Sequence, residues 1–365
     1  MTTDHRVSQK QELAVTHKEL FEEAESLFAR GKWQPASELY EKIVKLNDER
    51  TVTDEIVICY FRIFYMTSET KPGNTEEMLR FIPFRYRLPY EHTLEGLYLL
   101  ARAYAVLDRW DEVRQYAAEM MKQVELFFKK QNDNKFRNRP PFRRSIVAYY
   151  GQGLLMMSEA YESEMAYSEA RECLEDGFHL PLIYDALPED ILEAECLSLL
   201  VKGRLLALEL KTCELNRLPQ LASLIEEYPH LRLEGLIGSL IAANKYGFSL
   251  DHNLEEMLHH FTETPAFMIC GENQIRERDQ YSRMYYQSAV YWLDRGELMR
   301  GASQLLRSIK ISLYLKNQHR LLASLTMFEK HRQHIPDIIS VEIIKQCQER
   351  TKEATLRFPW KQMLL

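Results

Sequence analysis

Seven basic side chains gather in one short stretch of the sequence, where they could bind an anion. They are Lys129, Lys130, Lys135, Arg137, Arg139, Arg143 and Arg144. A single acid, Asp133, opposes them, and Phe136 and Phe142 lie among them. Such a basic patch attracts phosphate or an acidic partner. It is also typical of a solvated loop that only joins two helices, and both interpretations stay open.

A second set of side chains has the types needed to hold an extended peptide. Asn both donates and accepts hydrogen bonds, so it can pair with peptide amides, while charged side chains can bind the peptide's ends. Asn244, inside the apolar run LIAANKYGF, is the strongest member. Each residue alone could equally be a solvated surface side chain. From their helical phase we expect on one inner face Tyr98, Arg102, Glu159, Lys202, Asn244, Arg283, Tyr286 and Arg320.

The sequence offers little for catalysis or metal binding. It has no GxxxxGK[ST] phosphate loop, no GxSxG or HExxH motif and no kinase signature. His331 and His334 are three residues apart, but no cluster of cysteines or carboxylates accompanies them. We therefore expect a non-enzymatic protein without a cofactor or a metal ion.

These side chains must be positioned by helices, because one pattern of apolar and small residues recurs four times. It begins at Leu20, Leu97, Leu154 and Tyr285 and continues at steps of 4, 3, 4, 2, 3, 4 and 3 residues. The second position is always small, which lets two antiparallel helices approach closely. One such pair cannot bury its own apolar face, so the copies must stack. The small residues are Ala24, Ala101, Ser158 and Ala289.

The pattern resembles the tetratricopeptide repeat (TPR), whose period is about 34 residues. We therefore expect an all-α fold, a right-handed superhelical solenoid of about eight antiparallel helix pairs. The first helices would line its concave groove. The repeats are expected over 17–355, with a possible subdivision near 131–144, between a polar lead-in at 1–16 and a tail at 356–365. Pro83 should disturb the end of the helix that contains it.

Composition and charge limit the partners and the cellular compartment that we expect for this chain. The 365 residues carry a net charge of −7, which argues against a surface that coats nucleic acid. No apolar stretch approaches the roughly 20 residues that span a bilayer, and the first residues have no apolar signal-peptide core. The six cysteines include no CxxC pair, as in a reducing cytoplasm. We expect a cytoplasmic protein with no membrane contact, and its end repeats are compatible with a homodimer.

Four passages resemble the TPR halves of Gram-positive helix-turn-helix/TPR regulators, the peptide receptors grouped as RRNPP. They are RGKWQPASELYEKIV, IPFRYRLP, LIAANKYGFSLD and YYQSAVYWLDRGELMRGASQLLRSIKISLYL. The resemblance covers about 17–330 and implies a bacterial regulator that binds a short signal peptide in quorum sensing or transcriptional control. Those regulators carry an N-terminal helix-turn-helix domain, and the lead-in at 1–16 is too short for one. Either that domain was removed, or the chain is a stand-alone sensor that acts on a protein partner. We therefore expect no direct nucleic-acid contact from this chain.

The leading hypothesis is a regulator whose groove binds a short peptide and whose surface contacts a protein partner. Peptide binding would favour one superhelical curvature over another. The alternative is a constitutive scaffold or adaptor that holds a protein partner without any small ligand. A phosphatase activity related to the same receptors is a third hypothesis, but Gln9 and Gln11 in so short a lead-in do not supply the required catalytic glutamine.

Overall fold

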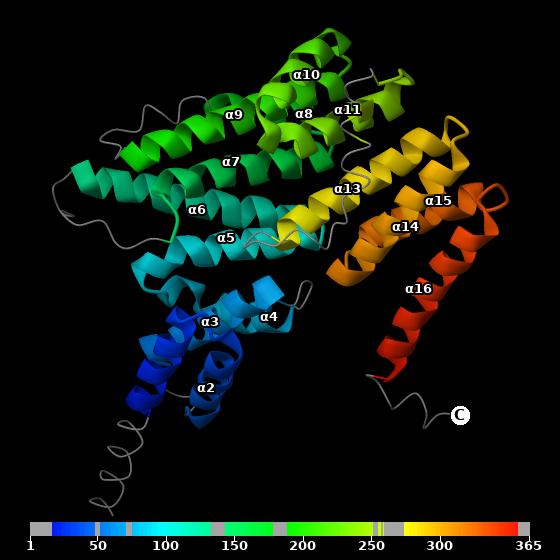
Figure 1. The fold of residues 1–365 in the computed structure, drawn as a ribbon. Coiled ribbons are helices and arrows are strands. Elements are labelled where there is room, and N and C mark those ends of the chain that lie inside the picture. The colour runs from blue at the N-terminus through cyan, green and yellow to red at the C-terminus, as the bar shows by residue number, and fades with distance from the viewer. Residues whose placement is uncertain are drawn as a thin grey trace, which may run out of the picture.

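The computed structural model is all-helical over the residues that it describes, with no strand among them (Figure 1). These residues are 17–47, 52–70, 75–132, 143–177, 188–250, 255, 256, 258 and 274–356. The all-α class expected from the sequence is therefore confirmed for this part of the chain. The lead-in 1–16, the residues 133–142 between two of the predicted pairs, and most of the tail lie outside it.

A first helix covers 17–29, and the helices that follow it have these bounds: α2 Trp33–Leu46, α3 Asp54–Thr70, α4 Glu76–Phe81, α5 Tyr90–Val106, α6 Trp110–Asn132, α7 Ile146–Ser163, α8 Tyr167–Gly177, α9 Pro188–Lys211, α10 Leu218–Glu227, α11 Arg232–Tyr246, α13 Gln274–Leu293, α14 Leu298–Leu315, α15 Gln318–His331 and α16 Asp337–Leu356. Short 3-10 helices, η1 (Ile82–Arg87), η3 (Leu215–Arg217) and η4 (Pro229–Leu231), precede some of them. Pro83 acts as predicted, because α4 ends at Phe81 and the tighter η1 follows.

The turn between two helices has the same backbone conformation in all four copies of the sequence pattern. The residues at one position of the pattern have positive φ angles: 71° at Gly31, 54° at Asp108, 61° at Met165 and 80° at Gly296. A left-handed residue here lets the next amide N–H reach a carbonyl in the last turn of the helix. These bonds are 3.0, 3.0, 2.9 and 3.0 Å long in the four copies. The spacing in the sequence therefore encodes one repeated helix–turn–helix geometry.

Small side chains allow the paired helices to pack closely, as the pattern predicts. The four small residues of the first helices, from Ala24 to Ala289, are all 0% exposed. On the second helix of the last copy, a Cβ added to Gly301 would lie 2.6 Å from Cγ of Leu293. Only glycine therefore fits at this position without movement of its neighbour.

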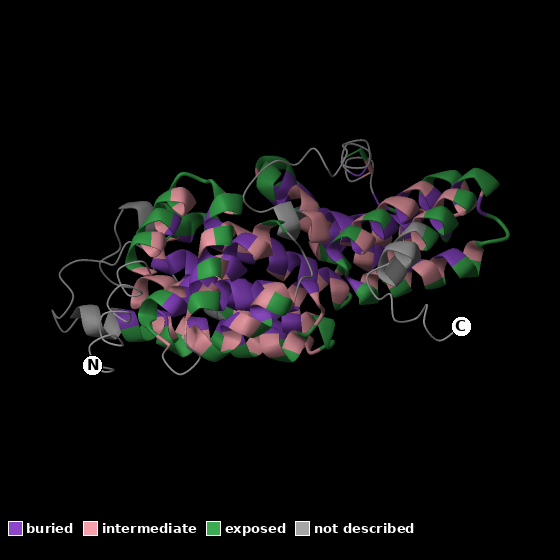
Figure 2. Cartoon of the chain, turned by 90° about the horizontal axis from the view of Figure 1, so that it is seen from below, coloured by how far each residue is buried: buried purple, intermediate pink, exposed green. Residues whose placement is uncertain are grey.

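Alternate helices contact one another in chain order. The series runs α3, α5, α7, α9, α11, α13 and α15, and each member contacts the next. The helices α4, α6, α8, α10 and α14 each pack against the preceding member of this series. Figure 2 shows that the buried residues lie on the inner sides of the helices, between their neighbours. This arrangement carries side chains from distant parts of the sequence into one series of neighbouring helices.

The series also contacts itself at a distance. α13 touches α5, and Val106 at the end of α5 packs with Leu315 at the end of α14 (Figure 1). Both side chains are buried, at 8% and 0% exposure. The helices α13 and α14 are therefore held against the middle of the chain by apolar as well as polar contacts. Within the described residues, no helix is both long enough and apolar enough to cross a membrane.

Candidate ligand-binding face

Four of the eight residues predicted for the groove come together in the structure. Glu159 lies on α7, Arg283 and Tyr286 on α13, and Arg320 on α15. Nη1 of Arg283 donates to Oε1 of Glu159, although the two residues are 124 positions apart. Cζ of Arg320 lies 5.8 Å from the centre of the Tyr286 ring. The predicted side chains thus join three helices of the series.

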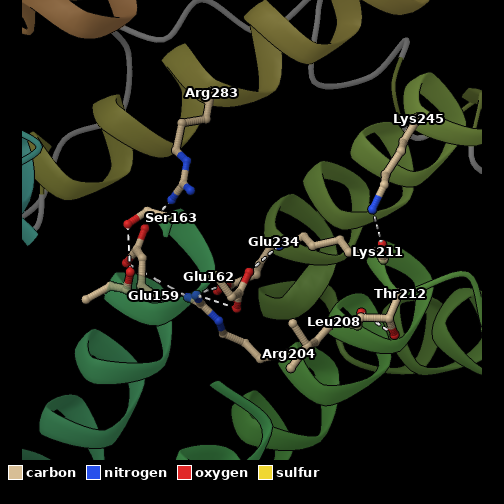
Figure 3. Close-up of polar contacts among 11 residues, drawn as sticks. Glu159, Glu162, Ser163, Arg204, Leu208, Lys211, Thr212, Glu234, Lys245 and Arg283 are labelled. Carbon is tan, nitrogen blue, oxygen red and sulfur yellow. Dashed lines mark hydrogen bonds and ion pairs between the residues drawn. The ribbon is translucent and has the colours of Figure 1, made fainter. Parts of the chain in front are cut away.

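Glu159 belongs to a larger group that we call the inner ion network: Glu159, Glu162, Arg204, Lys211, Glu234 and Arg283 (Figure 3). Arg204 is at its centre, with Nη2 3.2 Å from Oε1 of Glu162 and Nη1 2.6 Å from Oε1 of Glu234. Lys211 also bonds the Glu162 carboxylate. These side chains come from α7, α9, α11 and α13, so the network ties four successive members of the helix series together.

Burial and pairing compete at Glu162. Burial alone would raise the pKa of its carboxyl group. The charges of Lys211 and Arg204 together outweigh burial, and the pKa falls to about 2. Burial also works against the charge on Arg204, yet Glu234, Glu162 and Glu159 together raise its pKa. The Arg204 and Glu162 side chains are only 7% and 9% exposed. These charges remain ionised because each one is paired.

The network continues toward α15 through Asp108, Asp279 and Arg320. Burial raises the pKa of both Asp108 and Asp279, and nearby arginines oppose that change. Burial and the like charge of Arg283 lower the pKa of Arg320. The buried Nε of Arg320 has no hydrogen-bond partner among the described residues. Five carboxylates therefore face four cations across the whole group, and we interpret this near balance as a cross-link between helices.

Tyr98 and Arg102, also predicted for the groove, lie in a second group. We call it the N-terminal arginine cluster: Arg102, Arg143 and Arg144 with Glu69, Glu95 and Tyr98. Cζ of Arg144 lies 4.8 Å and Cζ of Arg102 5.8 Å from the centre of the Tyr98 ring. The structure thus unites two sets that the sequence kept apart, since Arg143 and Arg144 come from the basic patch.

Two carboxylates hold this cluster together. Nη2 of Arg102 lies 3.1 Å from Oε1 of Glu69. Glu95 is 3.4 Å from Nε of Arg144 and 4.0 Å from Nε of Arg143, and it accepts a 2.7 Å hydrogen bond from the Tyr149 hydroxyl. Burial raises the pKa of Glu69, while Arg102, Arg143 and Arg144 oppose that change. α3, α5 and the residues just before α7 supply these groups, so the cluster lies along the same helix series as the inner ion network.

The two remaining groove residues are placed differently. Nδ2 of Asn244 donates to the backbone carbonyl of Gln287 at 2.9 Å and to its side-chain oxygen at 3.0 Å, so Asn244 links α11 to α13. Its buried Oδ1 has no hydrogen-bond partner in the part of the chain that the structure describes. Lys202 is exposed on α9. Within the basic patch, Lys129 and Lys130 lie on α6 without described side chains, and Lys135, Arg137 and Arg139 lie outside the described residues.

Five residues of the extended network were not expected from the sequence: Glu162, Arg204, Lys211, Glu234 and Asp279. A signal was present, because Arg204 lies within a largely apolar helical run, LVKGRLLALEL. A charge within such a run is costly unless a partner reaches it from another helix. The described residues contain no group of three or more His, Cys, Asp or Glu side chains that could hold a metal ion. No known family model matches the chain, and no curated protein matches it either.

Proposed function

We propose that this chain is a TPR-like, right-handed solenoid of about eight antiparallel helix pairs, which acts in the cytoplasm as a non-enzymatic regulatory or signalling protein. Its concave face binds a short peptide. The four identical turns and the chain-order contacts of α3 to α15 support the architecture. In such a stack the first helices line the inner surface, and most residues of both charged groups belong to the helix series α3 to α15.

One observation carries the peptide hypothesis. Three of the eight predicted residues have a buried polar atom with no hydrogen-bond partner among the described residues: Nη1 of Arg102, Nε of Arg320 and Oδ1 of Asn244. A buried polar atom without a partner costs about 1–3 kcal/mol. An extended peptide supplies both N–H donors and carbonyl or carboxylate acceptors. These three atoms therefore favour a ligand with the mixed polarity of a peptide.

Binding would be coupled to curvature through the inner ion network. The Glu159–Arg283 pair joins α7 to α13, and a charged peptide group beside it competes for one of the two partners. A ligand that binds one curvature more tightly shifts the population toward it. The surface that contacts a protein partner would change with that shift.

Thermal unfolding with and without the low-molecular-mass peptide fraction of the host culture tests this function. A peptide at about 100 times its Kd adds about 2.7 kcal/mol to stability, which raises Tm by a few degrees. The rise should disappear after protease treatment of the fraction. The variant Asn244→Ala should weaken binding by about 1–3 kcal/mol, while Lys122→Ala on the exposed side of α6 should leave it unchanged. No rise in Tm at saturating extract would refute the peptide hypothesis.

A constitutive adaptor is the second candidate, and a different surface favours it. Near the end of the described chain, Leu322 is 67%, Ile338 77% and Val341 64% exposed. Ile338 and Val341 lie three residues apart and therefore on one face of α16. Grouped apolar side chains of this kind suit a protein partner. In a pull-down, the variant Ile338→Glu/Val341→Glu should lose the partner of an adaptor but keep the thermal response to a peptide.

A further inference from the structure

The N-terminal arginine cluster holds more positive than negative charge. Its described members include the three guanidinium groups of Arg102, Arg143 and Arg144 and two carboxylates, Glu69 and Glu95. The inner ion network has three carboxylates and three cations, and with Asp108, Asp279 and Arg320 included it has one more carboxylate than cations. An anionic group would therefore be attracted to the first cluster and not to the second.

The carboxylates of the cluster do not satisfy all of its donors. Glu69 pairs with Nη2 of Arg102, but Nη1 of Arg102 is buried without a hydrogen-bond partner in the described chain. Glu95 is shared by Arg143, Arg144 and the Tyr149 hydroxyl, and its ion-pair distances to the two arginines are 4.0 and 3.4 Å. Nε of Arg144 also lacks a hydrogen-bond partner there. A ligand with an acceptor oxygen could therefore bond Nη1 of Arg102 or Nε of Arg144, which lack a hydrogen-bond partner among the described residues.

A ligand can reach two of the three arginines of this cluster. The Arg143 and Arg144 side chains are 37% and 26% exposed, whereas Arg102 is only 7% exposed beneath them. The rings of Tyr65 and Tyr98 lie 4.8 Å from Cζ of Arg143 and Arg144, respectively, and hold the two guanidinium groups in place. The outer pair can thus touch a ligand while Arg102 adds its charge from below.

We propose that Arg143 and Arg144, with Arg102 beneath them, bind an oxyanion of the ligand, either a carboxylate or a phosphate group. This inference rests on the proposed function in assigning that oxyanion to a bound peptide. Arginine is suited to the task because its planar fork can donate two parallel hydrogen bonds to such a group. The site would fix which end or which side chain of the peptide lies next to α5 and α7.

The first test needs no peptide. Tm is measured in sodium phosphate and in sodium chloride at matched ionic strength for the wild type, for Arg143→Gln/Arg144→Gln and for the control Lys122→Gln. Phosphate should raise Tm of the wild type and the control relative to chloride, and the double variant should lose this rise. The same rise in all three proteins, or none in any, would overturn the anion site.

The second test uses the peptide fraction. The double variant should bind it about tenfold or more weakly than the wild type, because charge-assisted hydrogen bonds are lost. Arg143→Lys/Arg144→Lys should recover only part of the affinity, since it restores charge without the fork. Esterification of the fraction should abolish binding if the oxyanion is a carboxylate, and phosphatase treatment should do so if it is a phosphate.

The two tests separate this inference from the proposed function. If the fraction raises Tm of the double variant as much as that of the wild type, the peptide function stands and the assignment of its oxyanion to these arginines is wrong. If the phosphate response depends on Arg143 and Arg144 but the fraction has no effect on the wild type, the anion site stands and the peptide function falls.

Discussion

Glu162 is the residue on which the inner ion network most depends, because it pairs with both Arg204 and Lys211. Its carboxylate is nearly buried, and so is Arg204. Removal of one member of such a group leaves the others as buried charges without a full set of partners. That loss costs more than the pair itself contributes.

We therefore expect Glu162→Gln to lower the free energy of unfolding at pH 7 by about 3 kcal/mol. The matched control is Glu164→Gln, two positions along the chain. Glu164 pairs with Arg114 at the surface and should cost less than about 1 kcal/mol. Urea unfolding of the three proteins measures both values. Equal costs for the two variants would contradict the central place of Glu162.

The low pKa of Glu162 predicts that the stability of the protein depends on pH. Its pKa is about 2 in the folded protein, against an ordinary value of 4.5. The folded state therefore holds the proton less readily than the unfolded state. The stabilisation is present above pH 4.5 and is lost as the pH falls toward 2. Across that window it amounts to about 3 kcal/mol.

The wild type should accordingly lose more stability between pH 5 and pH 3 than Glu162→Gln does, because glutamine does not titrate. Urea midpoints at several pH values for both proteins give this comparison. Other carboxylates titrate in the two proteins alike, so the difference isolates Glu162. Parallel curves would show that its pKa is not depressed.

At the scale of elements, the repeated turn is the feature that decides how two helices meet. Two of its four copies place a glycine at the left-handed position, and the other two place Asp108 and Met165 there. A residue with a Cβ pays a conformational cost of about 1–2 kcal/mol in this region. At Met165 little packing offsets this cost, because its side chain is 74% exposed.

Met165→Gly should therefore raise the free energy of unfolding by about 0.5–1 kcal/mol, after the entropic cost of glycine is included. The control is Ser168→Gly, an exposed position inside α8, where glycine should instead lower stability by a similar amount. Thermal and urea unfolding report the sign in each case. A destabilised Met165→Gly protein would mean that the methionine side chain has a packing role.

The helix pairs were predictable from sequence because spacing, small residues and turn geometry are all local. That Tyr98, Arg102, Glu159 and Arg283 line a groove stays a prediction, although the structure places all four in the two charged groups. What could not be predicted was which charges meet. Glu159 and Arg283 pair across 124 residues, and their meeting depends on the summed rotation of every intervening turn. Nothing local encodes that sum.

At the scale of the whole molecule, α13 and α14 are held to the middle of the chain by few contacts. Glu159 pairs with Arg283, and Val106 packs with Leu315 and Ile311. The long series of helix contacts otherwise runs between neighbours, so we expect these links, together with the charges around Asp108, to determine the overall curvature. A change at one of them should alter shape more than it alters the helices.

Arg283→Gln should lower stability by about 1–3 kcal/mol and increase the radius of gyration, with unchanged helical content. Small-angle scattering and far-ultraviolet circular dichroism measure these effects. Arg300→Gln, on the outer side of α14, serves as the control and should leave the radius unchanged. An unchanged radius for Arg283→Gln would show that the apolar contact alone sets the curvature.

The contact between α5 and α13 also has a consequence for how the chain folds. Neighbouring helices meet through short loops, which close quickly and at small entropic cost, whereas this contact closes a loop of more than a hundred residues. The hairpins can form and stack before it, during synthesis as well as in refolding. The contact between α5 and α13 then forms last. In a nascent chain whose α13 is still inside the ribosome, we expect the N-terminal helices to be folded while Glu159 and Val106 still face water.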